Sequence, residues 1–138
     1  MFTSCLYLYI KINENKITAR NLKTGQEATR ISSPEFSSPR LLVADFTQAS
    51  QVMKGAVKEI SPLLSLRKKV IVHPLEKNEG GFGEIELRIF RELVLGACGS
   101  WETFLEEAIC TRDNALGERE IYAHWADGRA GDHFVSRK

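Results

Sequence analysis

Two segments, Arg40 to Ile60 and Lys69 to Ala97, repeat one pattern: a short apolar run followed by apolar residues at helical spacing. The runs are Leu41-Leu42-Val43 and Val70-Ile71-Val72. Continuous apolar runs of this kind are typical of strands buried on both faces. Because a crossover helix between two strands of one sheet places them parallel, the repeat predicts an α/β fold whose sheet is at least partly parallel.

The surrounding segments complete a mixed sheet. Cys5 to Ile12 alternates between apolar and polar residues, and the polar turn Asn13 to Lys16 leads into a hairpin partner. The predicted order is β-β-β-α-β-α-β-α, and Arg40 to Phe46 adds a strand before the first helix, with Thr47 as the helix cap. The expected strands are Cys5 to Ile12, Ile17 to Leu22, Glu27 to Ile31, Arg40 to Phe46, Lys69 to His73 and Trp101 to Leu105, and the last helix is Asn114 to Trp125.

The composition and net charge limit the classes of partner that this protein can bind. The 138 residues are 43% apolar, which is enough for one core, so we expect a single domain over residues 1–126 and a flexible polar tail over 127–138. A net charge of +1 gives no basic face for nucleic acid or for a membrane surface. No stretch approaches the roughly 20 apolar residues of a membrane span, and the start lacks the features of a signal peptide. We therefore expect a cytoplasmic protein with no nucleic-acid and no membrane partner.

The residues that most often carry chemistry are not arranged for it. Cys5, Cys98 and Cys110 lack the paired spacing of a disulfide framework or a zinc site. His73 ends an apolar strand, where a hydrogen-bonded structural histidine is more common than a base. Asp45 follows an apolar run and is favoured as a turn or helix-cap group. We expect no metal, no cofactor and no catalytic residue.

Two sets of short segments resemble known families. The first set is Leu42 to Thr47, Val70 to Pro74, Glu86 to Glu92, Gly96-Ala97 and Thr103 to Glu107. These segments resemble subdomain I of the actin-like superfamily, specifically its bacterial MreB branch, which has a ribonuclease H-like fold. The second set is Leu8-Tyr9-Ile10, Arg40-Leu41-Leu42 and Asn78-Glu79-Gly80-Gly81. This set resembles the YjaA-like family of small enterobacterial proteins.

The first resemblance implies a single actin-like lobe that has lost nucleotide binding. Actin-like ATPases carry Asp-x-Gly-Thr between their first two strands, where the aspartate organises magnesium and the glycine lets backbone amides reach the phosphates. The corresponding stretch, Ile10 to Asn15, contains neither Asp nor Gly, and the second lobe is missing from the chain. The related nucleases need a carboxylate in the first strand for metal-ion catalysis, and Cys5 to Ile12 has none. We therefore expect neither ATPase nor nuclease activity.

One loop is a candidate ligand site. Asn78, Gly80, Gly81 and Gly83 belong to a glycine-rich turn before a helix, where backbone amides can bind an anion. The turn lacks the lysine and the Ser/Thr of a phosphate loop. A flexible loop with glycines at positive φ is the favoured alternative.

The sequence favours a non-enzymatic interaction or regulatory protein. Its surfaces are expected at the edge of the early hairpin and at an exposed aromatic face of Tyr7 and Tyr9, since an open sheet edge can pair with another strand. A homodimer through that edge, an actin-like filament protein as partner, and a role in stress response all remain open. An anion- or ligand-binding module using Asn78 to Gly83 is the second hypothesis, and a metal-dependent enzyme is the third.

Overall fold

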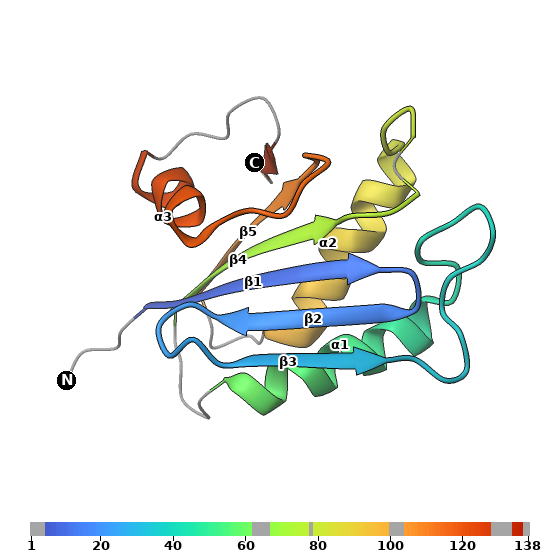
Figure 1. Ribbon diagram of the computed structural model, residues 1–138, viewed down its shortest axis with the longest axis horizontal. Helices are drawn as coiled ribbons and strands as arrows, with labels where there is room; N and C mark the ends of the chain where they lie inside the picture. The colour runs from blue at the N-terminus through green and yellow to red at the C-terminus, as the bar shows by residue number, and fades with distance from the viewer. Residues whose placement is uncertain (1–4, 62–66, 78, 100–103, 128–133, 137–138) are drawn as a thin grey trace.

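The computed structural model describes residues 5–61, 67–77, 79–99, 104–127 and 134–136. Within these residues the chain forms a mixed six-stranded sheet and three helices (Figure 1), which confirms the predicted α/β class. The elements are β1 (Cys5–Asn13), β2 (Lys16–Asn21), β3 (Glu27–Ile31), α1 (Phe46–Ile60), β4 (Arg67–Pro74), α2 (Glu84–Cys98), β5 (Phe104–Cys110), α3 (Glu118–Asp127) and β6 (Phe134–Ser136).

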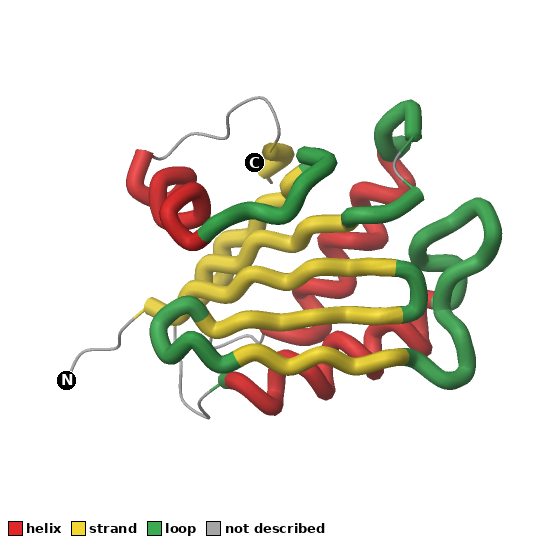
Figure 2. Tube along the Cα trace, in the orientation of Figure 1, coloured by secondary structure: helices red, strands yellow, loops and turns green. Residues whose placement is uncertain are grey.

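The strand order in the sheet is β3-β2-β1-β4-β5-β6. β1, β4 and β5 run parallel, whereas β2 is antiparallel to β1 and β3, and β6 is antiparallel to β5. α1 and α2 lie on one face of the sheet, and α3 lies on the other (Figure 1 and Figure 2). The carboxyl ends of the parallel strands therefore meet at one end of the sheet, as crossover connections require.

The main core lies between the sheet and the pair of helices α1 and α2. Leu8, Ile10 and Ile12 of β1 are fully buried on this face, as the two-residue period of a strand requires. The apolar stripe of α1 packs against the same face and confirms the helical periodicity of this segment. Its buried residues are Ala49, Val52, Met53, Ala56, Val57 and Ile60.

The strand expected over Arg40 to Phe46 does not form. Leu42 and Val43 are buried as their apolar character predicts, but they enter the core from a loop. The Ala44 amide donates to the Phe36 carbonyl at 2.7 Å, so the backbone is satisfied by a local turn in place of a neighbouring strand. An apolar run shows that a segment is buried and leaves its backbone conformation open.

The cap of α1 also differs from the prediction of Thr47. The N-cap is Asp45, whose Oδ1 accepts a hydrogen bond from the Gln48 amide at 3.0 Å. A carboxylate in this position satisfies an amide that has no partner within the helix. The alternative role suggested for Asp45, a helix cap, is therefore confirmed.

The C-terminal elements are displaced from their predicted positions. The last parallel strand is β5 in place of Trp101 to Leu105, and Trp101 itself lies outside the described residues. Glu106 and Glu107 interrupt the apolar pattern of β5, so the sequence pattern does not predict a strand through them. α3 begins at Glu118 and not at Asn114, and β6 lies within 127–138, the segment expected to be a flexible tail.

Candidate functional site

The glycine-rich turn before α2 has the backbone expected for it, but carboxylates lie at the start of the helix. Gly80 and Gly81 have φ values of +76° and +84°, which glycine adopts readily. The Gly83 amide donates to Glu86 Oε1 at 3.0 Å, and Glu84 adds a second carboxylate to the first turn of α2. These carboxylates already interact with the positive end of the helix dipole and repel anions. Asn78, the remaining residue of this candidate site, lies outside the described residues.

The aromatic face predicted to be exposed is covered by α3. Tyr9 is only 3% exposed and belongs to a second apolar cluster with Leu22, Ile71 and Ile121. Tyr7 is half-buried, and its ring lies 5.2 Å from that of Tyr122 on α3. The expectation of an exposed aromatic face is therefore wrong. The helix predicted over Asn114 to Trp125 was not assigned to that side of the sheet.

Under α3, Tyr9 takes part in a chain of hydrogen bonds that fixes one histidine tautomer. The Tyr9 hydroxyl lies 2.6 Å from His73 Nδ1, and His73 Nε2 lies 2.7 Å from the Arg112 carbonyl oxygen. Since a carbonyl only accepts, Nε2 carries the proton and Nδ1 accepts from the tyrosine. The Tyr9 oxygen in turn accepts from the Leu116 amide at 2.9 Å. The chain thereby joins β1 and β4 to the loop that leads into α3.

An ion pair closes the same loop. The Arg112 guanidinium binds the Glu120 carboxylate and also donates to the Ala115 carbonyl at 2.9 Å. Its hydrogen bonds, followed by that of the Gly117 amide, lower the pKa of Glu120 to about 2. The loop is therefore held at both of its ends, and this arrangement is structural in character.

His73 is not placed to act as a base on a substrate. Its side chain is fully buried, and both ring nitrogens have partners within the protein. Burial lowers the pKa of His73 below its ordinary value, and the Arg112 and Lys11 cations lower it further, while its hydrogen bond to Arg112 acts in the opposite direction. Burial likewise raises the pKa of Tyr9 to about 12. The sequence-based interpretation of His73 as a hydrogen-bonded structural histidine is confirmed.

We expect the free energy of unfolding to fall as the pH drops below about 6.5, the ordinary pKa of histidine. In that range the unfolded chain binds a proton at His73 that the folded chain excludes, so acid favours the unfolded state. Urea unfolding between about pH 5 and about pH 8 measures this loss. The variant His73→Gln has no titrating ring and should show a flatter profile. Equal losses in both proteins would contradict this assignment.

The open edge of the sheet at β3 presents a defined set of backbone groups. The Asn21 amide donates to the Gln26 carbonyl and the Ser32 amide donates to the Asn15 carbonyl, both at 2.8 Å. Hydrogen-bonded pairs alternate along an antiparallel ladder, so the even-numbered residues of β3 bond to β2. The amides and carbonyls that point away from β2 are therefore those of Glu27, Thr29 and Ile31.

No other strand pairs with β3 among the described residues. Glu27, Thr29 and Ile31 have exposed side chains, and Ile31 is 77% exposed. A shallow hollow of about 300 Å³ separates the end of β3 from α1, with Gln48, Gln51 and Val52 on its helix side. An unpaired edge of this kind can in general accept an extended strand.

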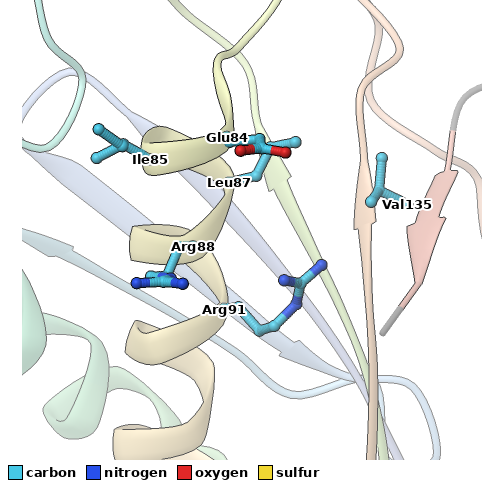
Figure 3. A pocket seen from close by; sticks show the side chains of 6 residues that line it. All are labelled: Glu84, Ile85, Leu87, Arg88, Arg91 and Val135. Atoms are coloured by element: carbon cyan, nitrogen blue, oxygen red, sulfur yellow. The ribbon is translucent and has the colours of Figure 1, made fainter. Parts of the chain in front are cut away.

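A second hollow, of about 520 Å³, lies beside α2 (Figure 3). Figure 3 shows Arg91 reaching from α2 toward the strands, where its Nε lies 4.0 Å from Oε1 of the buried Glu107. Ile85 and Arg88 point to the other side of the helix. The open form and mixed charge of this hollow select no particular ligand. Its lining residues are Glu84, Ile85, Leu87, Arg88, Arg91 and Val135.

Two further site classes find no support in the part of the chain that the structure describes. No group of three or more His, Cys, Asp or Glu side chains is arranged to hold a metal ion there. Cys98 and Cys110 are buried, and burial raises the pKa of both thiols, so neither is activated as a nucleophile. None of the described helices combines the length and the apolar character needed to cross a membrane.

The fold and these surfaces define a small α/β protein with a mixed sheet, a buried hydrogen-bonded histidine and an open strand edge. No protein-family model matches the chain. It is 38% identical over 97 residues to an Escherichia coli (strain K12) protein named "Uncharacterized protein YjaA", and the aligned part is 65% of this chain and 75% of that relative. The chain therefore belongs to the YjaA family, as its sequence resemblance predicted.

Tyr9 and His73 were each candidates from the sequence, but their hydrogen bond was not predictable, because residues 64 positions apart carry no local signal of contact. The Arg112–Glu120 pair had a partial signal. Gly117 and Glu120 repeat the Gly-x-x-Glu spacing of Gly83 and Glu86, and in both cases the glutamate accepts from the glycine amide at the start of a helix. This spacing is a variant of the capping box.

Proposed function

We propose that this protein is a non-enzymatic interaction protein built on a single actin-like lobe, and that the β3 edge is the surface through which it acts. The open β3 edge, with its outward amides and carbonyls, is the observation that carries the proposal. An extended strand added to such an edge gains backbone hydrogen bonds without any catalytic group.

The topology supports the actin-like assignment. The sheet order β3-β2-β1-β4-β5 with an antiparallel β2, two helices on one face and a third on the other, is compatible with the element order β-β-β-α-β-α-β-α predicted together with the resemblance to subdomain I. The additional strand β6 extends this arrangement at one edge. Fold resemblance alone does not establish function. Whether this lobe binds a nucleotide depends on the residues at the turn between β1 and β2.

That turn is occupied by the protein's own carboxylates, which supports the loss of nucleotide binding. Glu76 Oε2 accepts from Asn13 Nδ2 at 2.9 Å, and Glu76 Oε1 accepts from the Glu14 amide at 3.2 Å. Glu14 in turn forms an ion pair of 3.2 Å with Lys77. Two carboxylates at the place where an actin-like ATPase holds phosphate repel a polyanion and occupy an amide that would bind it.

We expect no change in the thermal unfolding temperature when Mg-ATP is added in large excess. A ligand at about 100 times its dissociation constant would add about 2.7 kcal/mol to the free energy of unfolding, which shifts the transition by several degrees. Differential scanning calorimetry with Mg-ATP, Mg-ADP and inorganic phosphate makes this measurement. A reproducible upward shift with ATP would contradict the loss of nucleotide binding.

The partner class that fits a degenerate actin-like lobe is a full-length actin-like filament protein. Co-sedimentation with polymerised filament protein tests the proposed function, using the wild type, Thr29→Pro and the control Thr29→Val. Proline at position 29 removes an outward amide and keeps the hydrogen bonds between β3 and β2. Valine keeps the outward amide and favours a strand. The proposal predicts that wild type and Thr29→Val pellet with filaments and that Thr29→Pro does not. If all three pellet equally, the β3 edge is not the binding surface.

A further inference from the structure

We infer that the strand which occupies the β3 edge is β3 of a second copy of this chain, paired antiparallel across a two-fold axis at Thr29. The inference rests on the proposed role of the β3 edge and names its occupant in the absence of a filament, which would bind the same edge in place of the second copy. A two-fold contact of this kind uses the same patch on both subunits, so the patch must be complementary to itself.

The backbone meets this requirement in one register. With Thr29 opposite its own copy, Glu27 lies opposite Ile31 of the second copy, and every outward residue of β3 faces another outward residue. Each of these pairs can exchange two hydrogen bonds. A shift of the axis to Ala28 or to Arg30 leaves one outward residue of each strand without a partner in β3. The Thr29 register therefore gives the largest number of hydrogen bonds.

Side chains on the face that carries α3 also fit this register. Thr18 and Thr29 already share a hydroxyl contact of 3.1 Å, so the axis places a row of four threonines side by side. Threonine pairs across neighbouring strands are favourable. Glu27 meets the apolar Ile31 of the second copy, with Lys16 of that copy one strand further on, so like charges do not face each other.

The other face is compatible with the same contact. Ala28 lies opposite Arg30 of the second copy, and its small side chain, buried under α1, does not project toward that arginine. Arg30 is held back against its own helix, where its guanidinium packs on Gly55 and pairs with Glu59 at 2.9 Å. Because α1 packs behind β2 and β3, the two-fold axis also brings the α1 helices of both copies to neighbouring positions (Figure 1).

Sedimentation equilibrium over a wide concentration range tests the dimer directly. The wild type and Thr29→Val should associate to twice the mass of the monomer, whereas Thr29→Pro should remain monomeric or dissociate at least tenfold more readily. A wild type that is monomeric at every concentration overturns the inference. If Thr29→Pro nevertheless abolishes filament co-sedimentation, the β3 edge keeps its proposed role with a different occupant. If neither measurement responds to Thr29→Pro, the proposed function fails as well.

A pair of variants at Ile31 tests the register. Both remove the same exposed side chain, but Ile31→Glu places a carboxylate opposite Glu27 of the second copy, whereas Ile31→Lys places a cation there. With two such contacts per dimer, each worth about 0.2–1 kcal/mol, the glutamate variant should dissociate roughly 2- to 30-fold more readily than the lysine variant.

Within one copy the order of these variants is reversed, because Lys16 lies opposite Ile31 on β2. Urea unfolding of dilute, monomeric protein should therefore find Ile31→Glu at least as stable as Ile31→Lys. A dimer that tolerates Ile31→Glu better than Ile31→Lys contradicts the Thr29 register, whereas opposite orders in the two experiments support it.

Discussion

The substitution Tyr9→Phe should lower the free energy of unfolding by about 2–4 kcal/mol, although it removes a single oxygen atom. That oxygen accepts from the Leu116 amide and its proton is donated to His73 Nδ1. Its loss leaves a fully buried ring nitrogen without a donor and the amide without an acceptor. Each orphaned buried group costs about 1–3 kcal/mol, which is a large share of the stability of a small domain.

Tyr122→Phe is the matched control for this change. The Tyr122 ring lies 5.2 Å from that of Tyr7, but Tyr122 is 40% exposed, so its hydroxyl can reach water. We expect its loss to alter stability by no more than about 0.5 kcal/mol. Urea unfolding at about pH 8, where histidine is neutral, compares the two variants with the wild type. Equal and small effects of both would show that the buried hydrogen-bond chain does not stabilise the fold.

The second large effect is expected at Asn15 in the turn between β1 and β2. Its Oδ1 accepts from the Phe36 and Ser37 amides, both at 2.8 Å, and its φ is +54°. Asn15→Ala removes both hydrogen bonds and leaves alanine in the left-handed region, which costs about 1–2 kcal/mol for residues without the local side-chain hydrogen bonds of asparagine. The total loss should be about 3–5 kcal/mol, because Phe36 anchors the loop to the core and is fully buried.

Two companion substitutions separate the causes. Asn15→Gly relieves the backbone strain and loses only the hydrogen bonds, so it should cost about 1–2 kcal/mol less than alanine. Asn15→Asp keeps an acceptor oxygen for both amides and should lie close to the wild type. Thermal and urea unfolding rank the variants. If alanine and aspartate are equally destabilising, the side-chain hydrogen bonds are not the cause.

The strongly periodic elements were predictable because their burial is local in sequence. The alternating pattern of β1 and the apolar stripe of α1 each indicate which side chains face the core. The run at Leu42 and Val43 carried the same burial signal, but its backbone bonds to Phe36 were not visible in the sequence. β5 was displaced because Glu106 and Glu107 interrupt its apolar pattern.

The site was less predictable because it depends on contacts between distant segments. The pairing of Tyr9 with His73 exists only after β1 and β4 become neighbours in the sheet. Covering of the aromatic face depends on where α3 packs, and the periodicity of α3 does not specify this. The open edge was predicted at the early hairpin, but β3 and β4 flank the two strands of that hairpin and the edge belongs to β3. The identity of the outward amides required the observed register.

Amide hydrogen exchange along β3, measured residue by residue by NMR, tests whether this edge is the binding surface. In dilute protein the amides of Ala28 and Arg30 should be protected by β2, while those of Glu27, Thr29 and Ile31 exchange rapidly. Raising the concentration or adding the filament protein should slow exchange at the three outward amides. If these amides exchange rapidly under every condition, the β3 edge binds no strand, which contradicts the proposed function.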